Sequence, residues 1–358
     1  MTTFAQALAI ARPALAKKPY VRHYMHFLCS NNMVVACDDR LGIRVVTSHP
    51  LNCCVPGVEF INAFTDGAEL KQQSSNVTIK HGSSTSKVPT LPAAEYPLLW
   101  PVPTSGEELE LSPNFIKALA ICMQGAGKDE DRPEFLGVTI IPNTAHGPAL
   151  VSTDNITITS CAIDVLSGNL SAPVVLPDPF CRALIAAHKG TKLFITLTVT
   201  ESKVFATIGD IGIFCSTPTS APWDYAGMMA KLNKQLAGVS SGAVPADWQE
   251  RMQRVLAVLG NKSHLGAPIT SGQRGITVYA ERDGFSASEF FQFDGTPPNG
   301  AWYDPRLLAR APKEVTSMQF GPTFLMMQDN IGALKYVVSA SSSARKTVDA
   351  SYDAEIPY

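Results

Sequence analysis

The sequence predicts an α+β protein in which one unit recurs three times and antiparallel sheets carry amphipathic helices on one face. Two observations predict this class. One order of elements occurs three times: a short helix-like stretch, then strand-like runs, then a second helix that opens at a Val-Pro or Asp-Pro step. Each unit has roughly 110–130 residues. Apolar residues alternate in the strand-like runs and recur at helical spacing in the other stretches. No single copy holds an obvious active site, so the repeat indicates an assembly whose function depends on its shape.

Length and composition fit three globular domains. The chain has 358 residues, of which 45% are hydrophobic and 17% charged. We predict domains at residues 1–103, 104–229 and 230–341, the third beginning with a linker at 230–245, and a flexible tail at 342–358. The net charge of −2 does not by itself indicate nucleic acid, but its distribution is uneven. Residues 1–103 include 9 basic and 6 acidic residues, residues 104–229 include 7 and 13, and residues 230–358 include 13 and 12.

The cysteines and the N-terminus predict a cytoplasmic protein. Eight cysteines form no C-x-x-C pair and no zinc spacing, and the last 143 residues contain none. We therefore expect reduced, mostly buried thiols. The N-terminal residues show no signal peptide, and no apolar stretch reaches the roughly 18–20 residues that span a membrane.

In the first repeat, Phe4, Leu8, Ala11 and Leu15 recur at helical spacing. The predicted elements are a helix at residues 3–17, strands at Tyr24–Cys29, Met33–Ala36 and Ile43–Thr47, a short helix from Val55, and a hairpin of Val77–His81 with Ser86–Val88.

In the second repeat, Ser112 is a good N-cap for a helix and Pro113 suits the first helical position. Asp178 and Pro179 repeat that pattern at the second helix. The predicted strands are Phe135–Pro142, Ala149–Ser152, Ile156–Ala162, Lys192–Thr200, Lys203–Ile208 and Ile211–Ser216.

In the third repeat, a Gly/Ser-containing connection at 230–245 precedes a helix with Trp248, Met252, Val255 and Leu259 on one face. Another helix begins at an Asp-Pro step after Tyr303. The predicted strands are Ile276–Ala280, Glu289–Phe293, Ser317–Phe320, Phe324–Gln328 and Leu334–Ala340.

This order of elements resembles the bacterial DNA polymerase III beta sliding clamp family from residue 3 to about residue 341. The motifs that carry the resemblance are Phe115–Leu119 (FIKAL), Asp131–Val138 (DRPEFLGV), Leu150–Asn155 (LVSTDN), the Leu-Pro start of the second helix, Pro222–Tyr225 (PWDY) and Tyr336–Val338 (YVV). The resemblance implies three repeated clamp domains with sheets outside and helices inside. It also implies that two protomers close head-to-tail as a ring around duplex DNA.

Three features depart from the family pattern. Asn155 stands where a Gly-His-Arg-type continuation is usual, Ser339–Ser341 replaces a Met-Pro-Met-like ending, and a tail of about 17 residues is added. These departures favour a divergent clamp, of phage origin in one interpretation. Its location would then be the host cytoplasm or nucleoid.

A clamp requires helices that present positive charge to phosphates without reading sequence, because base readout would oppose sliding. Arg306, Arg310 and Lys313 follow one another at i, i+4 and i+7, which predicts a basic face on the third repeat's second helix. The full set of candidate DNA-binding residues is Arg12, Lys17, Lys18, Lys117, Lys128, Arg132, Arg182, Lys189, Arg251, Arg254, Lys262, Arg306, Arg310 and Lys313. The alternative interpretation is that these are ordinary solvated helix faces.

The resemblance further implies a groove that binds short peptides of a polymerase or a clamp loader. Its candidate residues are Thr153, Asn155, Ile156, Ile158, Trp223, Gly227, Met228, Val337, Val338 and Ala340. The alternative is that these apolar residues are only core.

Signals for catalysis are poor. Gly125–Lys128 (GAGK) lacks the upstream Gly and the following Ser/Thr of a P-loop. The acidic residues Asp129, Glu130, Asp131 and Glu134 favour a solvated loop over a metal site. The seven His residues show no metal or catalytic spacing, and no G-x-S-x-G elbow occurs. We expect no catalytic residue, no metal and no cofactor.

The sequence thus predicts a sliding clamp whose partners are duplex DNA, peptides of the polymerase and the loader, and a second copy of itself. Two alternatives stay open: a monomeric adaptor with the clamp fold, and a metal-dependent nuclease or hydrolase built on acidic loops. The tail ends in Tyr352–Tyr358 (YDAEIPY), and an additional hypothesis is that this apolar and acidic end docks in the chain's own groove.

Overall fold

The computed structural model describes residues 2–18, 21–97, 100–103, 105–129, 131–218, 222–260, 267–272, 275–282, 284–298 and 301–340. These residues form two compact units. Unit 1 takes in residues 1–119 and 163–221, and unit 2 takes in residues 120–162 and the chain from 222 onward. Each unit therefore contains part of the second predicted repeat.

Unit 1 is an α+β assembly. Its helices are α1 (Phe4–Ala11), α2 (Gly57–Ala63) and α4 (Asp178–His188), with 3-10 turns at Arg12–Ala14, Arg22–Met25 and Ala93–Glu95. Its strands are β1 (His26–Ser30), β2 (Met33–Cys37), β3 (Leu41–Val46), β4 (Cys53–Pro56), β5 (Glu69–Gln72), β6 (Asn76–His81), β7 (Ser84–Pro89), β8 (Leu91–Pro92), β9 (Glu107–Leu111), β13 (Val165–Gly168), β14 (Val174–Pro177), β15 (Ile195–Val199), β16 (Lys203–Ile208) and β17 (Ile211–Ser216).

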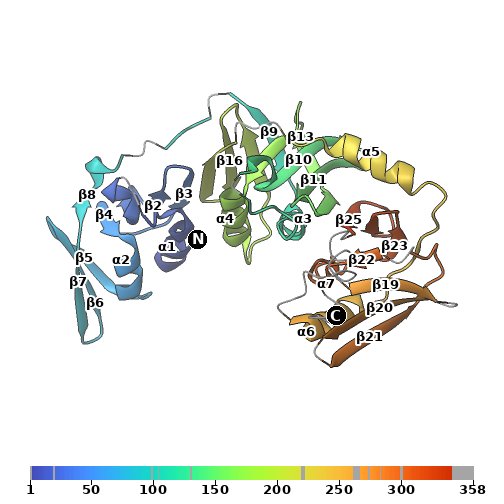
Figure 1. Cartoon of the computed structure of the whole chain (residues 1–358). Coiled ribbons are helices and arrows are strands. Elements are labelled where there is room, and N and C mark those ends of the chain that lie inside the picture. The colour runs from blue at the N-terminus through green and yellow to red at the C-terminus, as the bar shows by residue number, and fades with distance from the viewer. Residues whose placement is uncertain are drawn as a thin grey trace. The chain divides into compact units, whose positions relative to one another are not determined.

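A ten-stranded sheet joins the first and second repeats. Its order is β13-β9-β15-β16-β17-β3-β2-β1-β4-β8, and the repeats meet where Ile213 of β17 pairs antiparallel with Ile43 of β3. Helix α1 packs on β2 and β3, α4 packs on β16 and β17, and the two helices touch each other. Both helices therefore lie on the same face of the sheet, as Figure 1 shows. This arrangement confirms the predicted placement of helices on one face.

Local residue choices explain how these elements begin and turn. Thr3 and Gln6 form a reciprocal capping box at the start of α1, which satisfies two free backbone N–H groups. Asn31 and Asn32 both have positive φ, at 52° and 55°, in the two-residue turn between β1 and β2. Such turns match the twist of a hairpin, and Asn tolerates that conformation better than most residues.

Unit 2 is also α+β. Its helices are α5 (Tyr225–Gln235), α6 (Trp248–Leu259) and α7 (Pro305–Ala309), with a 3-10 turn at Pro133–Phe135; α3 (Phe115–Cys122) spans the division between the units. Its strands are β10 (Gly137–Thr144), β11 (Gly147–Thr153), β12 (Thr157–Ala162), β18 (Gly242–Ala243), β19 (Ala267–Gly272), β20 (Gly275–Arg282), β21 (Phe285–Gln292), β22 (Ala301–Tyr303), β23 (Ser317–Phe320), β24 (Phe324–Gln328) and β25 (Leu334–Ser339).

The main sheet of unit 2 joins the second and third repeats. Its strands run in the order β10-β11-β12-β25-β24-β23-β18, and Ile158 of β12 pairs antiparallel with Val337 of β25 at the junction. Because side chains alternate along a strand, this sheet has two distinct faces. On one face, Ser152 of β11 donates to the carbonyl of Cys122 at the end of α3.

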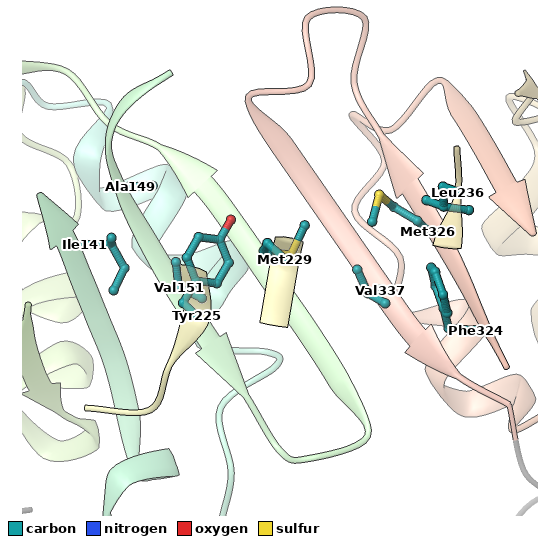
Figure 2. Packing of buried hydrophobic residues seen from close by; sticks show 9 residues of the cluster. All are labelled: Ile141, Ala149, Val151, Tyr225, Met229, Leu236, Phe324, Met326 and Val337. Carbon is teal, nitrogen blue, oxygen red and sulfur yellow. The ribbon is translucent and has the colours of Figure 1, made fainter. Parts of the chain in front are cut away.

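The other face of that sheet is covered by α5. Tyr225 and Met229 of α5 pack with Ala149 and Val151 of β11 and with Val337 of β25, within the apolar cluster drawn in Figure 2. Full burial of a side chain the size of Met229 contributes roughly 1.5–3 kcal/mol, so this helix is held mainly by its apolar face.

The third repeat adds a smaller sheet with the order β21-β20-β19-β22. Helix α6 packs on β20, β21 and α7. Its predicted apolar face is confirmed, since Trp248, Met252, Val255 and Leu259 are all buried. The Trp248 indole also donates to the carbonyl of Leu308 in α7 at 3.0 Å.

Several helices differ from their predicted extents. The helix predicted at 3–17 is α-helical only to Ala11, because Pro13 lacks the N–H that the next turn needs. Helix α7 ends at Ala309, with Pro312 shortly beyond it. Residues 225–235, partly predicted as a linker, form α5.

The two predicted N-caps of the second repeat also differ from expectation. The Ser112 Oγ is buried without a hydrogen-bond partner among the described residues, so it does not cap α3. Asp178 lies inside the first turn of α4 and Pro177 takes the N-cap position.

All eight cysteines are buried free thiols, as predicted. Burial raises the pKa of Cys53 to about 11 and that of Cys54 to about 12. Thiols with pKa values this high stay protonated near neutral pH and are poor nucleophiles.

Candidate functional site

A tight turn between β11 and β12 forms one wall of a pocket in unit 2. Asp154 Oδ1 accepts hydrogen bonds from the backbone N–H groups of Ile156 and Thr157, at 3.0 and 2.6 Å. Thr153 Oγ1 donates to the Thr157 carbonyl and accepts from the N–H of Asn155, whose φ is 71°. These bonds fix the turn and leave the Ile156 side chain 51% exposed at its tip.

The start of α5 forms the opposite wall. Asp224 is the N-cap, and its Oδ1 accepts a 2.8 Å hydrogen bond from the N–H of Gly227. A Cβ at Gly227 would lie 2.0 Å from Asp224 Oδ2, so any larger residue there would move the Asp224 carboxylate from its present position. Tyr225 turns inward, donates to Ser160 Oγ at 2.9 Å, and has a pKa raised by its burial.

The pocket between these walls has a cavity of about 330 Å³. Ile158 of β12, Phe324 of β24 and Val337 of β25 line it together with residues of both walls. The complete lining is Phe135, Thr153, Asn155, Ile156, Ile158, Trp223, Asp224, Met228, Lys231, Leu232, Thr323, Phe324, Val337 and Ser339. A cavity of this size, lined by both apolar and polar residues, suits one or two side chains of a short ligand.

The structure brings most of the predicted groove residues together. Thr153, Asn155, Ile156, Ile158, Trp223, Met228 and Val337 all line the pocket. Val338 is fully buried and, by strand alternation, faces the opposite side of the sheet from Val337. Gly227 serves the cap of α5, and Ala340 donates its N–H to the Thr323 carbonyl.

Several lining residues were not predicted from the sequence. Lys231 and Leu232 lie on α5, where a linker was expected, although Met228 and Leu232 are four residues apart as in an amphipathic helix. Phe324 and Ser339 come from strands that were predicted correctly, but no local pattern marks which strand face meets α5.

Four of the predicted DNA-binding arginines form ion pairs with nearby carboxylates. Arg182 Nε lies 2.6 Å from Asp178, one turn earlier in α4, and Arg306 Nη2 lies 2.5 Å from Asp304 at the start of α7. The hydrogen bond to Asp178 raises the pKa of Arg182.

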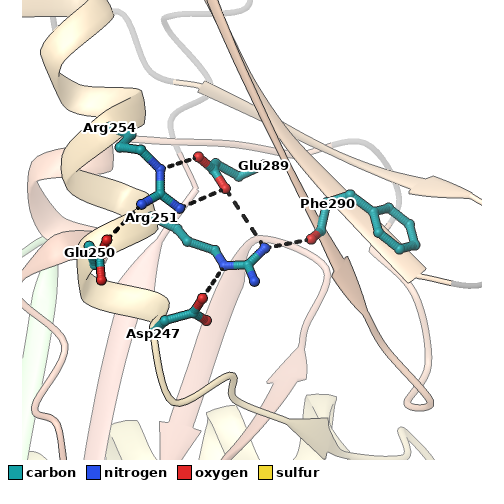
Figure 3. Close-up of polar contacts among 6 residues, drawn as sticks. All are labelled: Asp247, Glu250, Arg251, Arg254, Glu289 and Phe290. Atoms are coloured by element: carbon teal, nitrogen blue, oxygen red, sulfur yellow. Dashed lines mark hydrogen bonds and ion pairs between the residues drawn. The ribbon is translucent and has the colours of Figure 1, made fainter.

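The other two arginines attach α6 to β21. Arg254 binds Glu289 through two nitrogens, at 2.6 and 3.2 Å, and reaches Glu250 at 2.9 Å. Arg251 binds Asp247 at 2.7 Å and donates to the Phe290 carbonyl. Figure 3 shows both guanidinium groups directed at these acceptors. The hydrogen bond from Arg251 lowers the pKa of Asp247.

Most of the remaining basic candidates are exposed on helices and on the turns that follow them. No ion pair in the described part of the chain involves Arg12, Lys17, Lys18, Lys128, Lys189, Arg310 or Lys313, and all of these are exposed. Arg132 is exposed beside the Phe135 ring, and Lys117 is exposed on α3. Arg310 and Lys313 follow the end of α7, so the predicted three-residue helical stripe is absent. Lys262 lies outside the described residues.

The described residues include no cluster of three or more His, Cys, Asp or Glu side chains that could hold a metal ion. The acidic residues Asp129 and Asp131 lie in an exposed loop, and Glu130 is outside the described part. Among the described helices, none has both the length and the apolar character needed to cross a membrane.

Comparison with known proteins gives a consistent likeness in structure but none in sequence. No protein-family model and no curated protein matches the chain. The structure is similar to the DNA polymerase III beta subunit of Thermotoga maritima, with a TM-score of 0.77 and 17% identity over 94% of this chain and 96% of that one. It is also similar to the DNA polymerase sliding clamp of Bacillus subtilis, with a TM-score of 0.79 and 13% identity over 95% of this chain and 97% of that one.

A third similar structure is the DnaN sliding clamp of Pseudomonas aeruginosa bound to griselimycin. It has a TM-score of 0.78 and 12% identity over 94% of this chain and 96% of that one. The chain has the sliding-clamp fold. This finding confirms the α+β class with antiparallel sheets and the resemblance found in the sequence. The clamp fold extends over nearly the whole of this chain and of the clamps compared with it.

Proposed function

We propose that this protein is a DNA sliding clamp, a processivity factor that encircles duplex DNA and tethers a replicative polymerase. The observation that carries the proposal is the clamp fold itself, which spans 94–95% of the chain and 96–97% of the clamps it resembles. We retain the domain boundaries 1–103, 104–229 and 230–341 as part of the proposal. The protein would act in the cytoplasm, without a catalytic residue or a cofactor.

DNA would be held by diffuse phosphate contacts. Exposed lysines and arginines that form no ion pair with another described residue, such as Arg12, Lys17 and Lys189, are the residues best able to make these contacts. Contacts of this kind fix no sequence register, as sliding requires. Arg182, Arg251, Arg254 and Arg306 would contribute less, because their charges are already balanced by carboxylates.

The pocket of unit 2 would bind short peptides of the polymerase and of the clamp loader. Support comes from its apolar walls, its polar rim and its size. The Pseudomonas aeruginosa clamp binds griselimycin, which makes this compound a direct probe of the pocket here. Tethering through the pocket would raise the local concentration of polymerase at the primer end, and a loader ATPase would open the ring.

Ring closure would use a second copy of the chain in a head-to-tail dimer. Strand β21 stands at the edge of its sheet among the described strands and carries Phe285 and Phe290, which are 71% and 52% exposed. Exposed apolar edge strands are normally avoided in soluble monomers, because they pair with other chains. We therefore assign β21 to the interface between protomers.

The solution mass tests this function against a second candidate, a monomeric adaptor with the clamp fold. The neutralised arginines favour the adaptor, because they weaken the positive surface that a ring needs. Light scattering at micromolar concentration should give a mass near twice 38.4 kDa. A mass of one chain would favour the adaptor.

Griselimycin binding tests the pocket. We expect the compound to bind the wild-type chain and to bind Ile156→Ser about tenfold more weakly, since that side chain stands half-exposed at the rim. Ile331→Ser is the matched control, because Ile331 is 72% exposed and lies outside the pocket lining. Equal binding by both variants would count against the pocket as the binding site.

A further inference from the structure

The last described strand leads the chain to the rim of the pocket. Ser339, the final residue of β25, lines the pocket, and Ala340 donates its N–H to the carbonyl of Thr323 at 2.8 Å. Thr323 is itself a lining residue. Residues 341–358 lie outside the described residues, so eighteen further residues begin where the pocket opens.

The composition of those residues divides them into a spacer, residues 341–351, and an apolar and acidic end, residues 352–358. Residues 341–351 (SSSARKTVDAS) are mostly small or polar, whereas residues 352–358 (YDAEIPY) carry two tyrosines, an isoleucine and two carboxylates. The end is chemically complementary to the pocket. Its apolar side chains match the walls formed by Ile156, Trp223 and Met228. Its acidic side chains match Lys231, the basic residue of the lining, whereas the acidic lining residue Asp224 accepts the N–H of Gly227.

Chain length permits the end to reach the pocket. Eleven spacer residues can extend over roughly 35–40 Å. This is far more than the chain needs to fold back onto the pocket, because Ser339 is itself a lining residue. A ligand tethered by a short linker has an effective concentration in the millimolar range. Even a weak intrinsic affinity would therefore occupy the pocket for much of the time.

We propose that residues 352–358 dock in the chain's own pocket and compete there with partner peptides. This inference rests on the proposed function of the pocket as a peptide-binding site, and it adds regulation to that site. A partner peptide binds the pocket only by displacing residues 352–358. Peptides with several anchoring side chains are therefore favoured over peptides that bind weakly.

The test compares the full chain with a chain that ends at Ala340. Griselimycin should bind the shortened chain about threefold to tenfold more tightly, because the tethered competitor is gone. In the full chain, Ile356→Ser should shift the affinity toward that of the shortened chain. Val348→Ser, which changes an apolar residue of the spacer, should leave it unchanged. Equal affinity in the full and shortened chains overturns the proposal.

A synthetic peptide of residues 350–358 separates this proposal from the function of the pocket. The peptide should bind the shortened chain, Ile156→Ser should weaken its binding, and Ile331→Ser should not. No binding at about 1 mM, the concentration that a tether supplies, overturns the proposal. Loss of griselimycin binding with retained peptide binding counts against the clamp-like pocket and supports docking of the segment. Retention on DNA of the chain that ends at Ala340 tests the proposed clamp function independently of the docking segment.

Discussion

At the scale of single residues, Asp224 determines where α5 begins and so positions one wall of the pocket. Its carboxylate accepts from the N–H of Gly227, and no other side-chain cap of that helix occurs among the described residues. Met228 and Leu232, which follow on the same helix, line the pocket. The cap therefore links a local hydrogen bond to the shape of the binding site.

We predict that Asp224→Ala lowers the free energy of unfolding by about 1 kcal/mol, the usual cost of losing an N-cap. It should also weaken griselimycin binding, because the first turn of α5 frays at the pocket rim. Asp224→Asn, which keeps an acceptor, is the control and should lose less than half as much. Urea unfolding and titration calorimetry measure the two effects, and unchanged stability in Asp224→Ala would contradict the assignment of the cap.

His49 gives the stability of unit 1 a dependence on pH. Its Nε2–H donates to the Met33 carbonyl at 2.9 Å, and its Nδ1 accepts from the N–H of Leu51 at 3.2 Å. Burial lowers the pKa of His49, and protonation would also cost the bond from Leu51. Because the pKa is lower in the folded chain, the unfolded chain binds the proton first as the pH falls, and stability is lost below about pH 6.5.

We predict that unfolding midpoints in urea fall between pH 7 and pH 5, and that His49→Gln makes this fall shallower. The control is His81→Gln, which changes an exposed hairpin residue and should keep the wild-type slope. Parallel pH profiles for wild type and His49→Gln would show that another group is responsible.

At the scale of elements, the ion pairs of a helix decide which of its cations are available to the phosphates of the proposed DNA partner. Helix α4 shows the contrast: Arg182 is paired with Asp178, whereas no ion pair in the described residues involves Lys189 at its C-terminal end. If the chain contacts phosphates through α4, Lys189 is the residue that should carry the contact.

We predict that Lys189→Ala reduces the slope of log affinity for duplex DNA against log salt by about 1, the contribution of one phosphate contact. The double variant Asp178→Asn, Arg182→Ala removes a balanced pair from the same helix and should leave the slope unchanged. Fluorescence anisotropy at several salt concentrations measures both slopes, and equal losses would contradict the distinction between paired and unpaired cations.

Elements whose apolar residues recur with a clear period were predictable from sequence. Elements whose conformation depends on tertiary packing were not. The strands β16, β17, β23 and β24 have the predicted bounds, because their apolar residues alternate between turns. Helix α5 was missed in part because its polar residues and the following Gly/Ser stretch resemble a linker. Its helical state depends on packing Tyr225 and Met229 against a sheet whose strands are distant in sequence.

The lining of the pocket was predictable only in part, because tertiary packing decides which residues of each strand face it. The resemblance to the clamp family pointed to the β11–β12 turn and to β25, but strand alternation separates Val337 from Val338, and only the pairing of β25 with β12 shows which one faces α5. The ion pairs of Arg251 and Arg254 with Glu289 were not predictable, since Glu289 lies 35 residues after Arg254 and the register of β21 is set by the sheet.

At the scale of the whole molecule, the repeats are joined through continuous sheets. Strands β3 and β17 join the first and second repeats, and β12 and β25 join the second and third. The remaining edges are therefore the places where another protomer could add strands, and β21 is an edge strand that carries exposed aromatic side chains.

We predict that Phe290→Glu makes the chain monomeric at micromolar concentration, because it places a charge on the interface of the proposed dimer. Ile331→Glu adds the same charge at a residue that is 72% exposed in the loop before β25 and should leave the dimer intact. Light scattering with both variants measures the outcome, and a dimeric Phe290→Glu chain would remove β21 from the interface.

The central claim is topological, so the most direct measurement asks whether the protein stays on DNA that has no ends. The chain is incubated with linear duplex, the DNA is ligated into circles, and the circles are isolated in about 0.5 M NaCl, which weakens phosphate contacts. A sliding clamp remains on the circles and is released when a single restriction cut restores the ends. Equal retention before and after the cut, or no retention on the circles, would contradict an encircling clamp.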